Sequence, residues 1–270
     1  MEKFVRSIEP EYISKNVKYE DEDNENATKD HRMFNNCKLY CEGAHKPTFR
    51  GYFHLISLLL FPYIFWKYWE LTSGSQSDNT RTFGIEFYLA MFLVFAGFAT
   101  ILTSALYHTV CWNVEQEILI NKMDHFVLII FVMSIFYPIL LLTFSEEVKW
   151  IGYLFCAIIT VLTGWNMYGT LYGRPSLFRM MSVPFSQVPI FYYYHKFMTD
   201  FEWKAFWTCA ISQIVGVIIF VKEFTIFDPN IIGFHEIYHV TTIISMVAAY
   251  MMNYSIIERF LASKSNIEKE

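Results

Sequence analysis

The sequence predicts an all-α integral membrane protein, a bundle of seven transmembrane helices. Of the 270 residues, 54% are hydrophobic and only 17% are charged, well below the roughly 25% charged residues of soluble domains. Apolar runs of about 20 residues recur along the chain, and each can cross a hydrocarbon core of about 30 Å as a helix that rises 1.5 Å per residue. The formal net charge of −5 is small and gives no indication of a nucleic-acid partner.

The chain divides into three segments. Residues 1–45 are polar and acidic, and because they contain too few apolar side chains to form a core, we predict a disordered N-terminal tail. Residues 46–260 form the predicted seven-helix membrane domain, and residues 261–270 form a short polar C-terminal tail. The seven predicted spans are residues 51–69, 84–110, 123–144, 150–172, 177–197, 205–227 and 231–257.

The fifth predicted span differs from the others because it contains Arg179, Pro184, Gln187 and Pro189. A proline interrupts helical hydrogen bonding, and a charged side chain inside a bilayer needs a partner. We therefore predict a bent or broken helix that faces protein or a wet cavity. If this segment did not cross the membrane, the seventh span would begin on the opposite side.

Ionisable residues gather at one end of the predicted bundle. His108 lies near the end of the second span, Asp124 opens the third, and His235 and His239 open the seventh. With seven crossings, all of them lie on the side of the N-terminal tail, and so does His54 in the first span. Because ionisable groups inside a membrane are costly unless paired or ligated, this end is the predicted functional site.

The histidines have a spacing that suits a metal ion. His235 and His239 are four residues apart, so they share one helix face and can bind one ion. The alternative is that both histidines only pack or hydrogen-bond between helices. His108 would complete three protein ligands, which is the number that a catalytic zinc has while one position stays open for water. The sequence therefore predicts a Zn²⁺ site.

Two further residues are candidates for catalysis at this site. Ser104 lies one turn before His108, where it can hydrogen-bond a ligand or a bound water. Asp124 is expected at a helix N-terminus, where the helix dipole favours its ionised form. We predict that Asp124 accepts the proton of a zinc-bound water, with support of a ligand imidazole as the alternative role. Capping of the third helix is compatible with either role.

Residues 235–239 also match the H-E-x-x-H motif, in which the glutamate is the general base of a metalloprotease. That class needs a third zinc ligand. The next downstream acid is Glu258, nineteen residues after His239, and those side chains would be about 28 Å apart along a helix. A protease would therefore need a ligand from another span. Glu236 is expected to cap its helix, to line the site, or to lie in solvent near the helix start.

Four short segments carry a resemblance to a known family. They are Lys46–His54, Ser104–His108, Met123–His125 and Phe234–His239, and with them the chain resembles the hemolysin III family, which is related to the progestin and adiponectin receptors and to alkaline ceramidases. The resemblance implies a seven-helix bundle with zinc near the cytosolic face, held by His108, His235 and His239. It also implies a cytosolic N-terminus, whereas lysines and arginines near the span ends divide evenly between the two sides.

These observations lead to three hypotheses of function. The first is a zinc-dependent hydrolase of a lipid amide or ester, with a ceramide-like substrate that enters beside the bent fifth span, Asp124 as the base and Ser104 in support. The second is a membrane-lytic or pore-forming protein, although the spans show no charged stripe that would line a wide aqueous channel. The third is a receptor with structural zinc. The expected partners are the bilayer and a lipid-like substrate or ligand, and the oligomeric state is not indicated.

Overall fold

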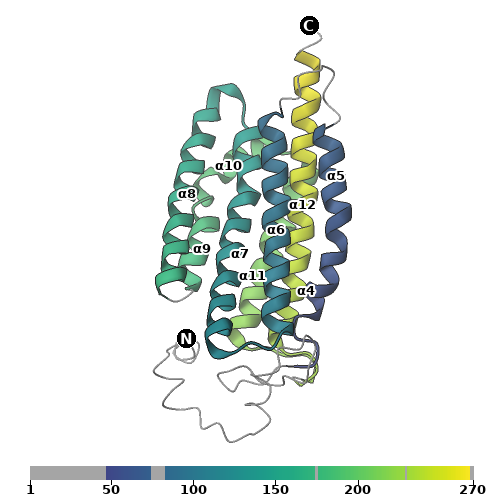
Figure 1. Cartoon of the computed structure of the whole chain (residues 1–270). Helices are drawn as coiled ribbons and strands as arrows, with labels where there is room; N and C mark the ends of the chain where they lie inside the picture. The colour runs from purple at the N-terminus through teal and green to yellow at the C-terminus, as the bar shows by residue number, and fades with distance from the viewer. Residues whose placement is uncertain (1–46, 74–82, 174–175, 229, 268–270) are drawn as a thin grey trace, which may run out of the picture.

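The computed structural model describes residues 47–73, 83–173, 176–228 and 230–267. Within these residues all regular structure is helical, and the long helices run side by side in one bundle (Figure 1). The predicted tail of residues 1–45 lies outside the described residues.

Five of the helices in the described residues are long and apolar enough to cross a membrane. They are α6 (Ile85–Thr109), α7 (Val114–Leu142), α8 (Lys149–Tyr172), α11 (Asp200–Lys222) and α12 (Phe234–Ile267). These helices correspond to the second, third, fourth, sixth and seventh predicted spans. They confirm an all-helical, multi-pass membrane protein, while seven crossings remain a prediction because the first and fifth segments are broken into shorter helices.

The first segment is broken where the sequence contains a proline. It consists of α4 (Tyr52–Ser57), the 3₁₀ helix η1 (Leu58–Leu60) and α5 (Phe61–Ser73). Pro62 follows η1, and a proline ring inside a helix clashes with the carbonyl group four residues earlier, here that of Leu58. The chain tightens into a 3₁₀ turn at this point and α5 starts again with Pro62 in its first turn, where proline is tolerated.

The fifth segment is broken as the sequence predicts. It consists of α9 (Leu177–Phe185), the 3₁₀ helix η3 (Val188–Ile190) and α10 (Phe191–Phe197). Pro184 lies in the last turn of α9 and Pro189 lies within η3. Both prolines therefore fall at the break, as their missing N–H groups require.

The polar side chains of the fifth segment face protein. Gln187 is fully buried and its Oε1 accepts a hydrogen bond from the Tyr194 hydroxyl at 2.6 Å. Arg179 donates from Nη2 to the backbone oxygen of Gly169 in α8 at 3.2 Å. These contacts are the partners that polar groups need at membrane depth.

The centre of the bundle is formed by α6, α7 and α12. In the most apolar stretch of α6 and of α12, 61% of the residues are buried, compared with 22% in α8 and 17% in α11. Leu93, Ile139 and Ile257 are fully buried between the central helices. The apolar side chains of α8 and α11 that face outward are consistent with contact to lipid rather than to protein.

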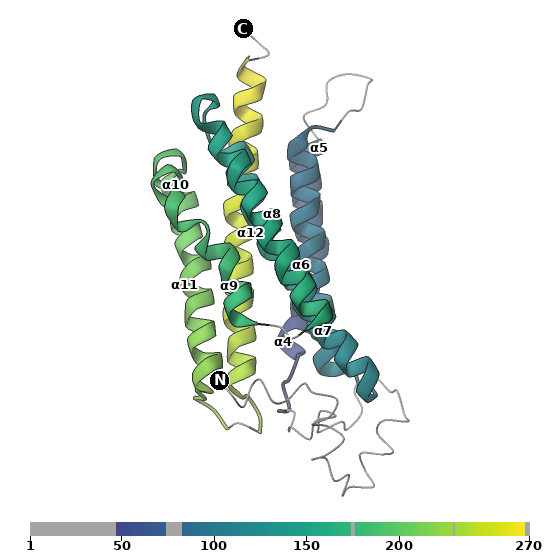
Figure 2. The same ribbon diagram turned by 90° about the vertical axis from the view of Figure 1, so that its left-hand side faces the viewer.

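The helices place the predicted site residues at one end of the bundle. The end of α6 and the starts of α4, α7 and α12 all lie together, away from the C-terminus (Figures 1 and 2). Helix α12 is continuous over 34 residues, about 51 Å at the helical rise. It ends ten residues after the predicted limit at residue 257 and includes most of the stretch that was predicted to be a polar tail.

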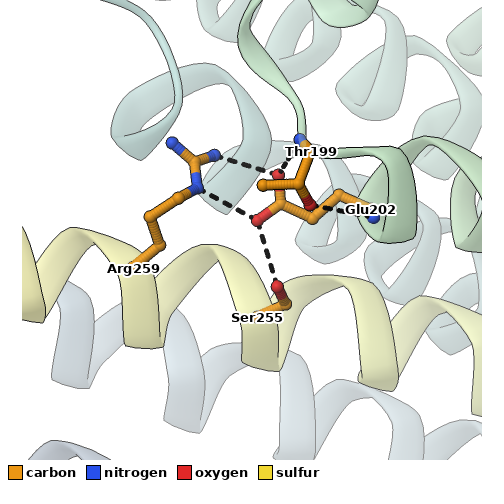
Figure 3. A network of polar contacts seen from close by, with 4 residues as sticks. All are labelled: Thr199, Glu202, Ser255 and Arg259. Carbon is orange, nitrogen blue, oxygen red and sulfur yellow. Dashed lines mark hydrogen bonds and ion pairs between the residues drawn. The ribbon is translucent and has the colours of Figure 1, made fainter.

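At the opposite end, a buried carboxylate joins α11 to α12 (Figure 3). Glu202 is fully buried and forms a capping box with Thr199 at the start of α11. Its two oxygens also accept hydrogen bonds from Nε and Nη2 of Arg259 at 3.2 and 3.0 Å, and from the Ser255 hydroxyl at 3.2 Å. This bidentate pair fixes α12 to α11 far from the histidines.

Candidate metal centre

The structure brings together the three histidines that were predicted as metal ligands. His108 lies in the last turn of α6, and His235 and His239 lie in the first two turns of α12. One ring nitrogen from each lies within 4.8 Å of the other two. His108 and His239 are buried and His235 is half-buried. The four-residue spacing on α12 directs two imidazoles towards the end of α6, because both lie on one helix face.

The geometry of the three rings suits a metal ion. Zinc–nitrogen bonds of about 2.0–2.1 Å in a tetrahedral shell place two nitrogens roughly 3.3–3.4 Å apart, and Nε2 of His108 lies 3.3 Å from Nε2 of His235. Nε2 of His239 is buried and has no hydrogen-bond partner, which is costly for a polar atom unless something binds it. Three imidazoles suit Zn²⁺, and they also suit copper, iron and nickel.

A fourth histidine contacts the cluster. Nε2 of His54 in α4 lies 2.9 Å from Nδ1 of His239, and the two rings meet edge to face with centroids 4.0 Å apart. Both side chains are buried. The sequence places His54 at the correct end of the bundle, but its pairing with a residue 185 positions away in the chain was not predicted.

Ser104 and Asp124 meet across the α6–α7 contact. Ser104 is buried, and its hydroxyl lies beside the Asp124 carboxyl group. The prediction that Asp124 lies at a helix N-terminus is wrong, because α7 begins at Val114. Its N-cap is Asn113, whose side chain accepts a hydrogen bond from the Gln116 backbone N–H at 2.9 Å. Asp124 lies about 15 Å further along the helix, so neither capping nor the helix dipole explains it.

Glu236 of the H-E-x-x-H match has two structural partners. Its Oε2 accepts a hydrogen bond from the Gly233 backbone N–H at 2.7 Å, and its Oε1 lies 2.8 Å from Nε of Arg50. The glutamate is completely buried. The expectation that it caps α12 is confirmed, and the alternative of a solvated residue is wrong. One oxygen therefore caps the helix and the other lies in a buried ion pair, so a role as protease base would require this carboxylate to give up a structural partner.

A short strap formed by residues 48–51 connects the start of α12 with the end of α6. The backbone N–H groups of Thr48 and Phe49 donate to the loop before α12, at 2.9 and 3.1 Å. Gly51 then turns with φ of 79°, a left-handed conformation that favours glycine. A Cβ at this position would lie 2.7 Å from Cβ of His108. Glycine therefore permits both the turn and the close packing against a candidate ligand.

The fold and the site define a class: a multi-pass helical membrane protein in which two helices bring three histidines together at one end. Comparison with family models agrees, because the model described as haemolysin-III related matches residues 42–250, which is more than half of the chain. The chain therefore belongs to the haemolysin-III related family. The matched region contains the strap and all three histidines. No curated protein matches the chain.

Proposed function

We propose that this protein is a zinc-dependent intramembrane hydrolase of a lipid amide or ester, with a ceramide-like lipid as its substrate class. The observation that supports the proposal most is the convergence of His108, His235 and His239, with one buried ring nitrogen that has no partner. When bound to three such ligands, Zn²⁺ supplies an open position that polarises a carbonyl group and lowers the pKa of water.

Asp124 is the group that handles the proton in this proposal. One of its carboxylate oxygens accepts a proton from the attacking water, and the same carboxyl group then donates that proton to the departing amine or alcohol. In this role the Ser104 hydroxyl, which lies beside the carboxylate, donates its hydrogen to it and orients it. These two residues lie on α6 and α7, two of the three helices at the centre of the bundle, and the packing of these helices sets their relative position.

The surroundings of the site favour a substrate that is itself a lipid. The loops that lead into α7 and α12 are short, with residues 110–113 between α6 and α7 and residues 223–233 between α11 and α12. The outer surface of the bundle carries exposed apolar side chains, such as Val161 in α8 and Ile218 in α11, which are 71% and 55% exposed. An amphipathic molecule can place its amide or ester at the bundle end while its acyl chain stays in the bilayer.

The test is turnover by the purified, zinc-loaded protein with a ceramide, an acyl ester and a peptide. We expect hydrolysis of the lipid amide or ester, a loss of at least about a hundredfold in Asp124→Asn, and no activity in His108→Ala. No turnover on any of the three by protein with stoichiometric zinc would contradict the proposal. Peptide cleavage that is lost in Glu236→Gln but kept in Asp124→Asn would instead support a protease.

A lytic function has its own signature. Release of a small dye from liposomes that carry the protein, at equal rates with and without metal, would support a membrane-lytic protein rather than a hydrolase.

The proposal also places the N-terminal face, and with it the histidines, on the cytosolic side of the membrane.

A further inference from the structure

The contact between His54 and His239 is the most informative feature that the proposed reaction does not use. His54 is only 3% exposed, and its Nε2 lies 2.9 Å from Nδ1 of His239. On the other side of the same ring, Nε2 of His239 is buried without a hydrogen-bond partner, and so is Nδ1 of His54. The His239 ring is therefore held on one edge by His54 and is open on the edge that serves metal binding.

The hydrogen bond between the two rings can run in either direction, and the directions have different consequences. A neutral imidazole carries one N–H and one lone pair. If Nδ1 of His239 donates to Nε2 of His54, the lone pair of His239 lies on Nε2 and can bind a metal ion, and the N–H of His54 lies on its Nδ1, which has no hydrogen-bond partner among the described residues. If His54 donates instead, Nε2 of His239 carries the hydrogen and cannot be a ligand.

We propose that His54 is a positioning residue of the metal centre: its Nε2 accepts the Nδ1 hydrogen of His239 and so keeps the Nε2 lone pair of His239 available to the ion. Metal-bound histidines usually donate their second N–H to a carboxylate, a backbone carbonyl or water, and here another imidazole takes that part. The inference rests on the metal site of the proposed function, but it does not depend on which reaction the site catalyses.

The backbone holds His54 in this position. Arg50 and His54 are four residues apart, while their partners Glu236 and His239 are three apart. Glu236 and His239 share one face of α12, whereas Arg50 and His54 lie on either side of the Gly51 turn. The ion pair and the histidine pair therefore join the same two segments. Gly51, between Arg50 and His54, brings this segment against His108. The first segment therefore supports two of the three candidate ligands.

The experiment measures zinc affinity in the full-length protein in detergent by competition with a chromophoric chelator. His54→Leu removes the acceptor nitrogen and leaves an apolar side chain that still fills much of the buried space of the imidazole. The matched pair His54→Gln and His54→Asn separates positioning from folding, because the longer amide oxygen reaches the place of Nε2 and the shorter one does not. His195→Leu, in α10 at the other end of the bundle, is the control.

We expect His54→Leu and His54→Asn to bind zinc about 10–100-fold more weakly, and His54→Gln to recover most of that loss. His195→Leu should bind as the wild type does. In the Co²⁺-loaded protein, the visible absorption bands should shift in His54→Leu, while X-ray absorption should count the same number of nitrogen ligands.

Three results would overturn the inference. One is wild-type zinc affinity and an unchanged Co²⁺ spectrum in His54→Leu. Another is the loss of one nitrogen ligand in that variant, which would make His54 a ligand itself. The third is equal weakening in His54→Gln and His54→Asn. His108→Ala shows separately whether the three histidines bind zinc at all. If they do not, this variant binds zinc as the wild type does, and the proposed metal site itself is wrong.

Discussion

The buried ion pair between Arg50 and Glu236 allows a quantitative test of the strap. In Arg50→Leu, the completely buried Glu236 carboxylate would keep the Gly233 N–H but lose its cationic partner, 2.8 Å away. Removing one member of a buried pair costs about 3–5 kcal/mol, because an uncompensated charge remains in the protein. We therefore expect the free energy of unfolding to fall by that amount.

The assay is reversible unfolding in mixed micelles with increasing denaturing detergent. Lys67→Leu is the control, because Lys67 forms an ion pair with Glu70 in which the side chains are 36% and 55% exposed, and exposed pairs contribute about 0–1 kcal/mol. The double variant Arg50→Leu/Glu236→Gln removes the unpaired charge. It should be more stable than Arg50→Leu alone. Its loss of stability should also be about 1–3 kcal/mol smaller than the sum of the losses in the two single variants. Equal stability of Arg50→Leu and Lys67→Leu, or additive losses in the double variant, would refute the reasoning.

Three further outcomes are expected. Gly51→Ala should lower the free energy of unfolding by about 1–3 kcal/mol, since φ at this position is 79°, and denaturation measures this loss. The added Cβ should also weaken zinc binding, because it clashes with His108, and chelator competition measures that effect. Arg259→Met should cost about 1–3 kcal/mol in the same unfolding assay, less than Arg50→Leu because the Arg259 side chain is 39% exposed. It should leave zinc affinity unchanged, because the start of α11, where Glu202 lies, is at the opposite end of the bundle. Chelation should lower the melting temperature of the wild type, where zinc at a hundred times its Kd adds about 2.7 kcal/mol, but not that of His239→Ala.

The sequence predicts membrane helices better than it predicts their ends. The break in the fifth segment is visible because Pro184 and Pro189 lie inside an apolar run, and the same signal at Pro62 explains the unpredicted break in the first. Hydropathy locates the hydrocarbon core, whereas a helix ends where its hydrogen bonds and caps end. For this reason α7 begins at its cap Asn113, well before the apolar stretch, and α12 continues to Ile267.

The site shows a similar division. The number of predicted membrane crossings between them and their helical spacing predict that His108, His235 and His239 lie at one end of the bundle. The structure brings them together. Their roles as ligands, and those of Ser104 and Asp124 in catalysis, stay predictions. The contacts of the first segment with α12 could not be predicted, because spacing within one helix identifies a face but not the helix that packs against it. The available signal was His54, which lies one turn inside the first span at the same end of the bundle as the site.

The continuity of α12 has a consequence for topology mapping. His235 and Arg259 lie 24 residues apart on one unbroken helix, about 36 Å, which exceeds the roughly 30 Å of a hydrocarbon core. A compartment-sensitive reporter fused after this helix therefore reads the side of the membrane opposite the histidines, whether or not the first and fifth segments cross. Under the proposed cytosolic orientation of the histidines, a glycosylation acceptor placed there would be modified in the secretory pathway, whereas the opposite orientation would leave it unmodified. One fusion protein would therefore locate the candidate metal centre.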